Sequence, residues 1–496
     1  MNAIATLPRP ETTHASGTLV PVSVAFGDGI GPEIMRAALK VLVAARARIA
    51  VEPIDIGEQV YLAGNSSGIP ASAWDSIRRT KVLFKAPITT PQGGGYKSLN
   101  VTIRKSLGLF ANVRPCVAYH PFVATRHPGM DLVIVRENEE DLYAGIEHRQ
   151  TDEVFQCLKL VSRPGCEKIV RYAFEYARAH GRGKVTCLTK DNIMKMTDGL
   201  LHKTFDATAR DYPEISTEHQ IIDIGAARIA DSPEAFDVIV TSNLYGDIVS
   251  DIAAQVAGSV GLAPSANVGA HGAMFEAIHG SAPDIAGQDV ANPSGLLLAG
   301  VMMLVHIGQS DIAEVVHNAW LRAIEDGIQT PDIYTSGVSR EKVGTMAFAD
   351  AVIARLGREP KLLRAARYDA AAHALTIPEP QVHAAAQRDL VGIDVFVQSR
   401  APVEHLAATL QAAAIPGLDL TMITNRGVKV WPQGMPETFC TDHWRCRFMI
   451  EAGRQFNRAM IIDLLRRLNL VGIDFIKTEN LYTFDGEPGY SLGQGQ

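Results

Sequence analysis

Asp247 and Asp251 stand four residues apart, directly after the apolar run 237–241. A spacing of four places both side chains on one face of a helix, near its beginning. Two close carboxylates repel each other unless a cation neutralises them, and hard oxygen ligands suit Mg²⁺ or Mn²⁺. The pair by itself is equally typical of a capping aspartate beside a surface aspartate. The sequence therefore predicts either a divalent-metal site or an ordinary helix start.

Three arginines, Arg104, Arg114 and Arg136, follow a glycine-rich loop and lie at boundaries between loops and predicted strands. A planar guanidinium group can clamp a carboxylate through two parallel hydrogen bonds. Ser98 and Asn100 precede the first arginine and can also hydrogen-bond a carboxylate. A single arginine is usually a solvated surface residue, but three in this arrangement favour a small polycarboxylic acid as the substrate.

Tyr143 and Lys190 are candidates for proton transfer. Either type of side chain can donate or accept a proton once burial or neighbouring charges shift its pKa. Taken alone, each is more often structural. The glycine- and proline-punctuated segment 276–287 suits the close approach of a nucleotide, although an ordinary surface loop is the commoner interpretation of such a segment.

The elements that must position these residues follow an α/β pattern over about the first 350 residues. Short apolar runs alternate with helix-like segments, and polar turns follow them at 20–26, 81–86, 131–135, 184–188 and 237–241. Pro32 is placed as a first-turn helix residue. The spacing of Gly27, Gly29 and Gly31 differs from the Rossmann fingerprint, which disfavours that fold.

Beyond an Ala- and Arg-rich stretch at 357–387, a second domain is expected. Its order is strand, helix, strand, strand, helix, strand, if two short strands around Asn425 count as one bent strand. This is the ferredoxin-like α+β order, βαββαβ. The expected strands are 395–398, 418–424 with 428–431, 445–451 and 474–477, and the expected helices are 403–414 and 458–468.

Composition narrows the class of protein. The 496 residues carry a net charge of −7, which argues against nucleic acid or an anionic membrane as the main partner. The longest apolar stretch, 296–305, is too short to cross a bilayer. Six scattered cysteines and a first stretch without an apolar signal core favour the reducing cytoplasm.

Together these segments resemble the β-decarboxylating dehydrogenase family, which includes isocitrate, isopropylmalate and homoisocitrate dehydrogenases. The likeness runs through about residues 20–350 and rests on three motifs: Gly-Asp-Gly-Ile-Gly-Pro-Glu at 27–33, Asn-x-x-Gly-Asp-x-x-Ser-Asp at 243–251 and His-Gly-Ser-Ala-Pro at 279–283. The segments 439–444 and 489–492 look like the extra C-terminal domain of the extended bacterial members.

The resemblance implies a two-domain α/β fold that is not a Rossmann fold. Residues 1–109 and 258–350 would form a large domain, and residues 110–257 a small domain with a dimer clasp at about 141–162. A linker at 351–387 and an α+β domain at 388–496 would follow. The resemblance also implies a homodimer in which each active site borrows Lys190 and Asp223 from the partner.

The resemblance assigns roles residue by residue. Tyr143 and Lys190 would be catalytic, and Asp223, Asp247 and Asp251 would bind Mg²⁺ or Mn²⁺. The substrate would be held by Ser98, Asn100, Arg104, Arg114 and Arg136. The cofactor would contact Thr89, Thr90, Glu276, His279, Gly280, Asp284, Ile285, Ala291 and Asn292.

The polar pair Ser98 and Asn100 favours isocitrate, since a polar pair facing the alkyl chain of isopropylmalate would be left unpaired. The expected reaction is oxidative decarboxylation to 2-oxoglutarate in the tricarboxylic acid cycle. By the resemblance, Asp284 and Ile285 stand where NADP-using members carry Lys-Tyr, and Ala291 stands where they tend to carry a larger residue. NAD is therefore expected, with NADP as the alternative. Homoisocitrate or 3-isopropylmalate oxidation and a non-catalytic subunit remain rivals. The C-terminal domain could be a sensor or an assembly module.

Overall fold

The computed structural model describes residues 18–91, 97–368, 382–451 and 453–493. The glycine-rich stretch 92–96 and the middle of the expected linker, 369–381, therefore lie outside the described residues. The chain forms two compact units, Met1–Ala144 with Lys159–Gln381 and Gly145–Leu158 with Val382–Gln496. Each unit is described by itself.

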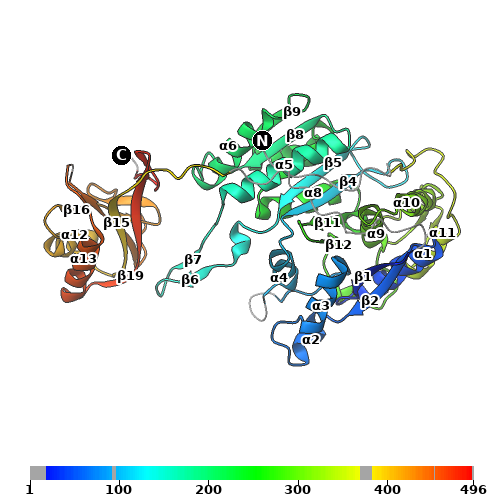
Figure 1. Ribbon diagram of the computed structural model, residues 1–496, viewed down its shortest axis with the longest axis horizontal. Coiled ribbons are helices and arrows are strands. Elements are labelled where there is room, and N and C mark those ends of the chain that lie inside the picture. Colours follow the sequence, from blue (N-terminus) through cyan, green and yellow to red (C-terminus); the bar gives the residue numbers. More distant parts are fainter. Residues whose placement is uncertain (1–17, 92–96, 369–381, 452, 494–496) are drawn as a thin grey trace. The chain divides into compact units, whose positions relative to one another are not determined.

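One sheet of ten strands organises the first unit, in the order β2-β1-β3-β12-β11-β4-β5-β10-β8-β9 (Figure 1). The strands are β1 Val20–Ala25, β2 Ile49–Ile54, β3 Val82–Lys85, β4 Ala111–Val117, β5 Asp131–Glu137, β8 Lys184–Thr189, β9 Ser216–Ile221, β10 Val238–Thr241, β11 Pro264–Val268 and β12 Ala273–Ala277. Strand β11 is antiparallel to both its neighbours, and β4 is antiparallel to β5. The remaining pairs are parallel. Two parallel groups therefore run in opposite directions within one sheet.

Helices cover both faces of this sheet. They are α1 Gly31–Ala44, α2 Glu58–Leu62, α3 Ala71–Thr80, α4 Leu99–Ser106, α5 Arg163–Ala179, α6 Thr197–Ala209, α7 Ile222–Asp231, α8 Asn243–Ala257, α9 Ser294–His306, α10 Ser310–Glu325 and α11 Thr345–Ile353. Buried side chains of α1, α9, α10 and α11 form one core with β1 and β3, and those of α5 and α6 form another with β5, β8 and β10. Short pieces complete the unit: η1 Leu142–Ala144, η2 Pro233–Ala235, η3 Val260–Leu262, η4 Pro283–Ile285, β13 Ile328–Gln329 and β14 Glu341–Lys342.

The α/β expectation is confirmed. The five apolar runs predicted as strands are β1, β3, β5, β8 and β10, each within two residues of the expected bounds. Pro32 lies in the first turn of α1, as its fixed φ and missing N–H favour. The mixed strand order also differs from the all-parallel Rossmann sheet. The boundary between the two expected domains of this region stays a prediction.

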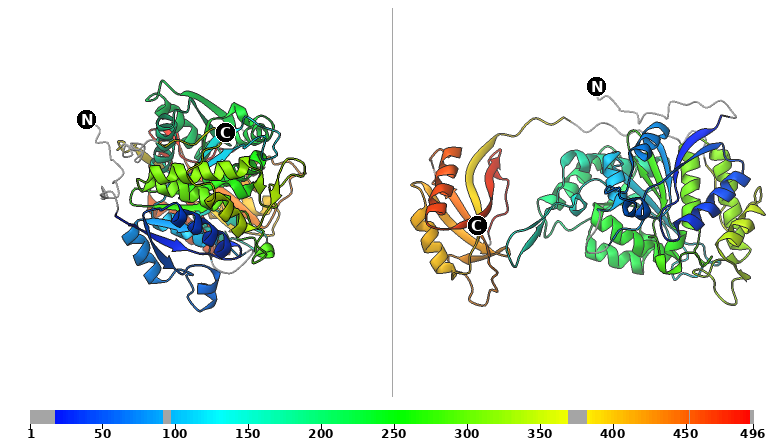
Figure 2. Two further views of the ribbon diagram at one scale, coloured as in Figure 1. Left: turned by 90° about the vertical axis from the view of Figure 1, so that its right-hand side faces the viewer. Right: turned by 90° about the horizontal axis from the view of Figure 1, so that it is seen from below.

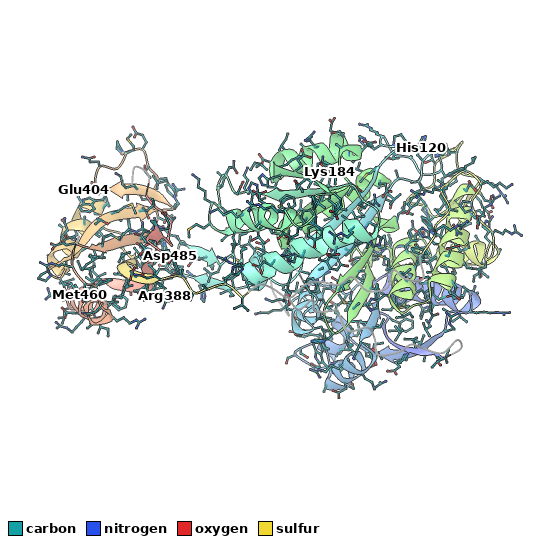
Figure 3. The ribbon with its side chains drawn as sticks, turned by 45° about the horizontal axis from the view of Figure 1, so that its top comes forward. His120, Lys184, Arg388, Glu404, Met460 and Asp485 are labelled. Carbon is teal, nitrogen blue, oxygen red and sulfur yellow. The ribbon has the colours of Figure 1, made fainter. Side chains whose placement is uncertain are left out.

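The second unit contains a six-stranded antiparallel sheet in the order β17-β16-β18-β15-β19-β20. Its elements are β15 Arg388–Gln398, α12 Val403–Ala413, β16 Leu418–Asn425, β17 Val428–Trp431, β18 His443–Ile450, α13 Arg458–Leu470, β19 Asp474–Phe484 and β20 Glu487–Pro488. Both helices lie on one face of the sheet and share its core (Figure 2). Arg388, the first residue of β15, and Asp485, which directly follows β19, lie near each other at one end of this strand pair (Figure 3).

The βαββαβ order is confirmed for β15, α12, β16, β18, α13 and β19. The idea of a single bent strand around Asn425 is wrong, because β16 and β17 pair with each other as a hairpin. Arg426 and Gly427 both have positive φ, 49° and 82°. Two-residue turns with positive φ at both positions are favoured in hairpins because they match the twist of the paired strands.

A second hairpin, β6 Glu147–Arg149 with β7 Phe155–Cys157, belongs to this unit and lies within the expected clasp. Its turn is bound to the segment before β18. Thr151 Oγ1 donates to Asp442 at 2.5 Å, and the Asp442 amide donates to Glu153 at 2.9 Å. In the described parts of the chain, no helix is both long and apolar enough to span a membrane.

Candidate active site

Asp247 and Asp251 lie on α8, which begins directly after β10. Asp247 is the centre of a network of donors: the Tyr143 hydroxyl donates to it at 2.6 Å, Arg114 Nη1 lies 3.3 Å from it, and Arg136 Nη1 also donates to it. Burial tends to raise the pKa of Asp247, but the charges of Arg136 and Arg114 outweigh it and the pKa is lowered. Asp247 is therefore a carboxylate, rather than a helix cap, held among cations.

Asp251 lies one turn further along α8, with Arg114 Nη1 at 3.8 Å. Burial raises its pKa, Arg114 opposes this, and the neighbouring charge of Asp247 adds to the rise. The side chain is 62% exposed, so its carboxylate remains open to a ligand. The pair therefore meets the expectation of two carboxylates on one helix face.

The buried arginines are fixed by the same helix. Arg136 Nε and Nη2 donate to Asn243 Oδ1 at 3.1 and 2.8 Å, and Arg114 Nη1 donates to Ser250 at 2.6 Å. Gly246 is needed because a Cβ there would lie 2.5 Å from Arg136 Cγ. Asn243, Gly246 and Ser250, three residues of the motif 243–251, thus position the two arginines beside the Asp247 carboxylate.

Tyr143 lies in η1, just after β5, and the Arg136 guanidinium stacks over its ring at 5.0 Å. Burial raises the pKa of its hydroxyl, which Arg136 opposes and Asp247 reinforces. The phenol is therefore protonated at neutral pH, as a proton donor must be.

Arg104, on α4, belongs to the same site. Its charge contributes to the lowered pKa of Asp247 and opposes the rise in the pKa of Tyr143. Its Nη2 donates to Glu276 at 2.8 Å, and its buried Nε has no partner among the described residues. Glu276 lies on β12 and also binds Lys85 Nζ at 2.7 Å. Burial raises the pKa of Glu276, but the two cations outweigh it and keep the group ionised. The sequence did not lead us to predict Lys85 as a site residue. A charged residue inside the otherwise apolar run 81–86 was the signal that could have identified it.

Ser98 and Asn100 flank the start of α4. Ser98 is its N-cap, accepting from the Val101 amide at 3.5 Å, and it also accepts from Thr90 Oγ1 at 3.3 Å. The buried Asn100 Oδ1 has no partner in the described chain. Asn100 and Arg104 are four residues apart and therefore share a helix face. The unpaired amide oxygen is consistent with a ligand contact.

Three loops meet where β1, β3 and β12, which are neighbours and parallel, reach their carboxyl ends. The Asp28 carboxylate accepts from the Thr89 amide at 3.0 Å, and the Ile30 amide donates to Ser281 O at 2.8 Å. Thr89 Oγ1 lies 3.0 Å from Ser281 Oγ. Gly29 has φ 58°, and a Cβ there would lie 2.0 Å from Ser281 O. Ligands of α/β sheets commonly bind beyond the carboxyl ends of such strands.

The remaining residues predicted to bind the cofactor differ in their exposure and in their hydrogen-bond partners. Burial lowers the pKa of His279, and its buried Nε2 has no partner among the described residues. Gly280, Asp284 and Ile285 are exposed. Asn292 is instead bound within the fold, to Asp332 at 3.0 Å and to the Ser294 amide at 2.9 Å.

Lys190 and Asp223 form a separate pair, with Nζ and Oδ1 2.8 Å apart. They follow β8 and β9, and the hydrogen bond from Lys190 lowers the pKa of Asp223. Within the described part of one chain, the carboxylates of Asp223, Asp247 and Asp251 do not lie close enough together to bind one metal ion. One chain therefore brings together most of the predicted residues, but not this pair.

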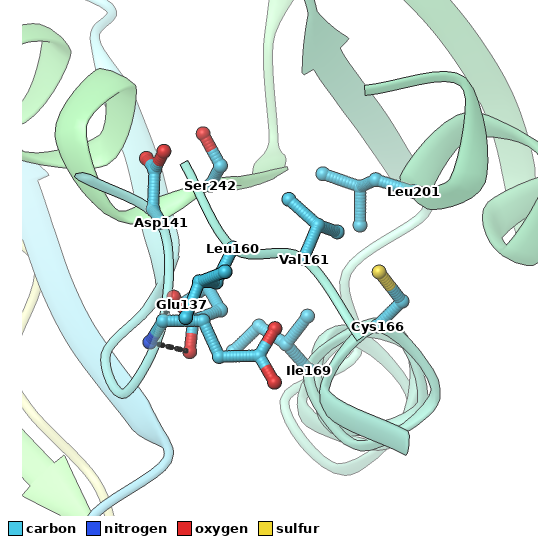
Figure 4. A pocket seen from close by; sticks show the side chains of 9 residues that line it. Glu137, Asp141, Leu160, Val161, Cys166, Ile169, Leu201 and Ser242 are labelled. Atoms are coloured by element: carbon cyan, nitrogen blue, oxygen red, sulfur yellow. Dashed lines mark hydrogen bonds between the residues drawn. The ribbon is translucent and has the colours of Figure 1, made fainter. Parts of the chain in front are cut away.

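A small pocket lies beside the site without belonging to it (Figure 4). Its lining includes Glu137, Asp141, Leu160, Leu201 and Ser242, and none of the predicted substrate residues. Burial raises the pKa of Glu137 to about 7, which two backbone N–H groups oppose. Asp141 accepts from the Leu244 amide at 2.8 Å and so supports the start of α8.

Comparison with known proteins places the geometry in a family. The family described as isocitrate/isopropylmalate dehydrogenase matches residues 21–352, and the one described as bacterial isocitrate dehydrogenase, C-terminal domain, matches residues 388–496. Isocitrate dehydrogenase (NADP) of Rickettsia bellii is 56% identical over 478 residues, covering 96% of this chain and 99% of that protein. The protein of the same name from Thermus thermophilus is 44% identical and covers 96% of both. A crystal structure of a Thermus thermophilus protein has a TM-score of 0.89 at 43% identity, covering 96% of both chains.

These relatives correct the cofactor expectation: NAD is wrong, because both full-length relatives are named for NADP. Two physical reasons account for the error. The Asp284 side chain is exposed, so water and salt screen its repulsion of a 2′-phosphate and it can rotate away. Ala291 is 2% exposed and packs in the core, so packing, rather than the cofactor, sets its size.

Proposed function

The chain belongs to the isocitrate/isopropylmalate dehydrogenase family, and from this premise we propose that it oxidises and decarboxylates isocitrate with NADP as hydride acceptor. The observation that carries the proposal is the convergence of Arg114, Arg136 and Tyr143 on Asp247. Two buried cations can hold carboxylates, and a protonated phenol can supply a proton, within one site. The NADP names of two relatives that cover 96% of the chain support the cofactor.

The carboxylates of α8 fit a divalent ion. Asp247 and Asp251 offer hard oxygen atoms on one helix face, and their mutual repulsion would be relieved by a cation. With Asp223 of a second copy as third ligand, they would hold Mg²⁺ or Mn²⁺. A metal bound there would polarise the hydroxyl and adjacent carboxylate of the substrate.

The protein side chains carry the remaining steps of the proposed reaction. The hydroxyl proton of isocitrate would leave toward Lys190 of the second copy, and NADP⁺ bound at the site would supply the acceptor for the hydride from the same carbon. The bond to the β-carboxylate then breaks, CO₂ leaves and the electron pair forms an enolate. Tyr143 protonates the carbon of this enolate, giving 2-oxoglutarate, and the cationic Arg136 beside it stabilises the phenolate that remains.

Substrate choice rests on the start of α4. We infer that Ser98 and Asn100 read the distal carboxylate of isocitrate, because the Ser98 hydroxyl and the Asn100 Nδ2 group can both donate hydrogen bonds to it. Arg104, four residues further on, would bind a carboxylate through its unpaired Nε. An alkyl group in this place would leave these polar atoms unpaired, which disfavours isopropylmalate.

Steady-state kinetics tests the proposed reaction. Isocitrate, homoisocitrate and 3-isopropylmalate are compared under NADP and NAD, with Mg²⁺ and with EDTA. We expect kcat/KM to be highest for isocitrate with NADP, and turnover to stop in EDTA. Asp247→Asn should abolish metal-dependent turnover, whereas the exposed Asp231→Asn on α7 is the matched control and should not. A faster rate with either rival acid would refute the substrate, and no turnover at all would favour a non-catalytic subunit.

Among the described residues of one chain, Asp223, which pairs with Lys190, does not group with Asp247 and Asp251, and this supports a site shared between two copies. Mixed refolding of Asp247→Asn and Lys190→Ala chains tests this, since each variant alone should be inactive. A mixed dimer would contain one site with both changes and one with neither, so about a quarter of wild-type activity should return in a statistical mixture of dimers. No recovery in the mixture would mean that each site is built from a single chain.

A further inference from the structure

A second group of chemically active side chains lies outside the site described above. Asp191 follows β8, His202 lies on α6 and His219 lies on β9. One ligand atom from each lies within 4.8 Å of the other two, a combination found at this place alone within the described ranges of the chain. His202 Nδ1 is 2.6 Å from Asp191 Oδ2, and His219 Nε2 is 3.9 Å from Asp191 Oδ1. His219 Nε2 also lies 2.8 Å from Thr189 Oγ1, a hydrogen bond that a bound ion would replace. Both imidazoles therefore face one carboxylate.

The two rings are stacked, with centroids 3.5 Å apart and planes 14° from parallel. The stacking places a ring nitrogen of each imidazole beside the same carboxylate, that of Asp191. Neutral imidazole is the form that binds metal ions.

A further carboxylate completes the pattern. His202 Nε2, the ring nitrogen turned away from Asp191, lies 3.6 Å from Asp206 Oδ2. Histidines that bind metal commonly direct their other ring nitrogen to a carboxylate, which orients the ring and raises its basicity. Asp206 is in place for this role with only a small rotation.

We propose that Asp191, His202 and His219 form a binding site for a divalent transition-metal ion of the Zn²⁺ type. Two imidazoles and one carboxylate suit Zn²⁺, Co²⁺ or Ni²⁺ better than Mg²⁺, which prefers oxygen ligands alone. Ligand bonds of about 2.0–2.2 Å require the three atoms to draw closer together, which rotation of the side chains can supply. The ion replaces the hydrogen bond between His202 and Asp191 with a bond to each.

Such an ion would connect three elements beside Lys190. Asp191 is the next residue, and the Lys190 amide is already held by Asp198, on α6, at 2.7 Å. An ion joining β9, α6 and the end of β8 would limit the motion of the loop that carries the Lys190 ammonium group. The site is therefore a positioning site, separate from the proposed substrate metal, and it stands whether or not the proposed reaction is correct.

Metal binding to the full chain, without a polyhistidine tag, tests the proposal. The protein is stripped with chelator, placed in saturating Mg²⁺ to fill hard-ligand sites, and titrated with Co²⁺ while visible absorption is followed. We expect one Co²⁺ per chain with the absorption of a nitrogen-coordinated ion, and its displacement by Zn²⁺. His219→Gln should weaken binding on the order of 100-fold, since even indirect partners of metal ligands are worth about 10–100-fold.

Two matched variants identify the site. His180 is an exposed histidine at the C-terminal end of α5. The His180→Gln variant should bind Co²⁺ as wild type does, and so should Asp247→Asn. Absence of Co²⁺ uptake by wild type in Mg²⁺, or unchanged affinity in His219→Gln, would overturn the proposal. X-ray absorption at the zinc edge of loaded wild type needs no variant: two imidazole ligands support the site, and fewer than two refute it.

Discussion

Replacing Glu276 with Gln is expected to destabilise the first unit by about 3–5 kcal/mol, the cost of leaving a buried charge without its partner. Glu276 is the shared anion of Lys85 and Arg104, whose nitrogen atoms lie 2.7 and 2.8 Å from its oxygens. None of the three side chains is more than 9% exposed. Glutamine keeps the shape but removes the charge, so two buried cations lose their counter-ion.

Urea unfolding at pH 7, followed by circular dichroism, measures this change. Glu52→Gln is the matched control, because Glu52 also binds an arginine through both oxygens, with Arg79 61% exposed. That surface pair should contribute little to stability, because solvent screens it. If Glu276→Gln costs no more than Glu52→Gln, the reasoning from burial is wrong.

The difference in unfolding free energy between wild type and Glu276→Gln should depend on pH. Burial raises the pKa of Glu276, but Lys85 and Arg104 lower it by more, so the folded-state pKa lies below the unfolded value. A carboxyl group whose pKa is lower in the folded state stabilises that state at pH values above its unfolded-state pKa, which is about 4.3 for glutamate. This stabilisation is lost as the pH falls toward the folded-state pKa. The stability difference between wild type and Glu276→Gln should therefore be full at pH 7 and shrink below about pH 4.3. A difference that stays constant down to pH 3 would contradict the ion-pair explanation.

Three further outcomes are expected. Tyr143→Phe should lower kcat about 10²- to 10⁴-fold with little change in isocitrate binding, because it removes the proposed proton donor; a kcat within twofold of wild type would exclude that role. Gly246→Ala should raise KM for isocitrate and cost about 1–3 kcal/mol of stability, because the new methyl group would meet Arg136 Cγ at 2.5 Å; kinetics and thermal unfolding check both. Asp394→Asn should destabilise the C-terminal unit by about 3–5 kcal/mol, because Arg447 makes two 2.8 Å bonds to Asp394 and is buried; limited proteolysis of residues 388–493 should then accelerate, and unchanged cleavage would count against it.

Much of the fold was accessible from local patterns. The strands β1, β3, β5, β8 and β10 were predicted from short apolar runs, because a strand buried on both faces is apolar at every position. The start of α1 was predicted from Pro32, because proline fits a first helical turn. The hairpin between β16 and β17 was missed, although the turn residues Arg426 and Gly427 were a usable signal.

The cofactor shows where reasoning from single residues failed. The identity of Asp284 indicated NAD, but the relatives that match the whole chain are named for NADP. A residue type says which charge is present, but not how far solvent screens it. Ala291 failed for a different reason, since its small size is required by the core against which it packs.

The sequence by itself determined the family, the α/β elements and the chemistry available at Asp247, Tyr143 and Arg136, because these follow from residue types and short spacings. Tertiary structure alone decided that Glu276 pairs with Lys85 and Arg104, which lie 191 and 172 residues away along the chain. The pairing with Lys85 follows because strand order makes β3 and β12 neighbours. It likewise paired Asp223 with Lys190 and, among the described residues of one chain, did not group Asp223 with Asp247 and Asp251. Spacing along a chain governs which side chains share an element, whereas the order of strands in a sheet governs which elements meet.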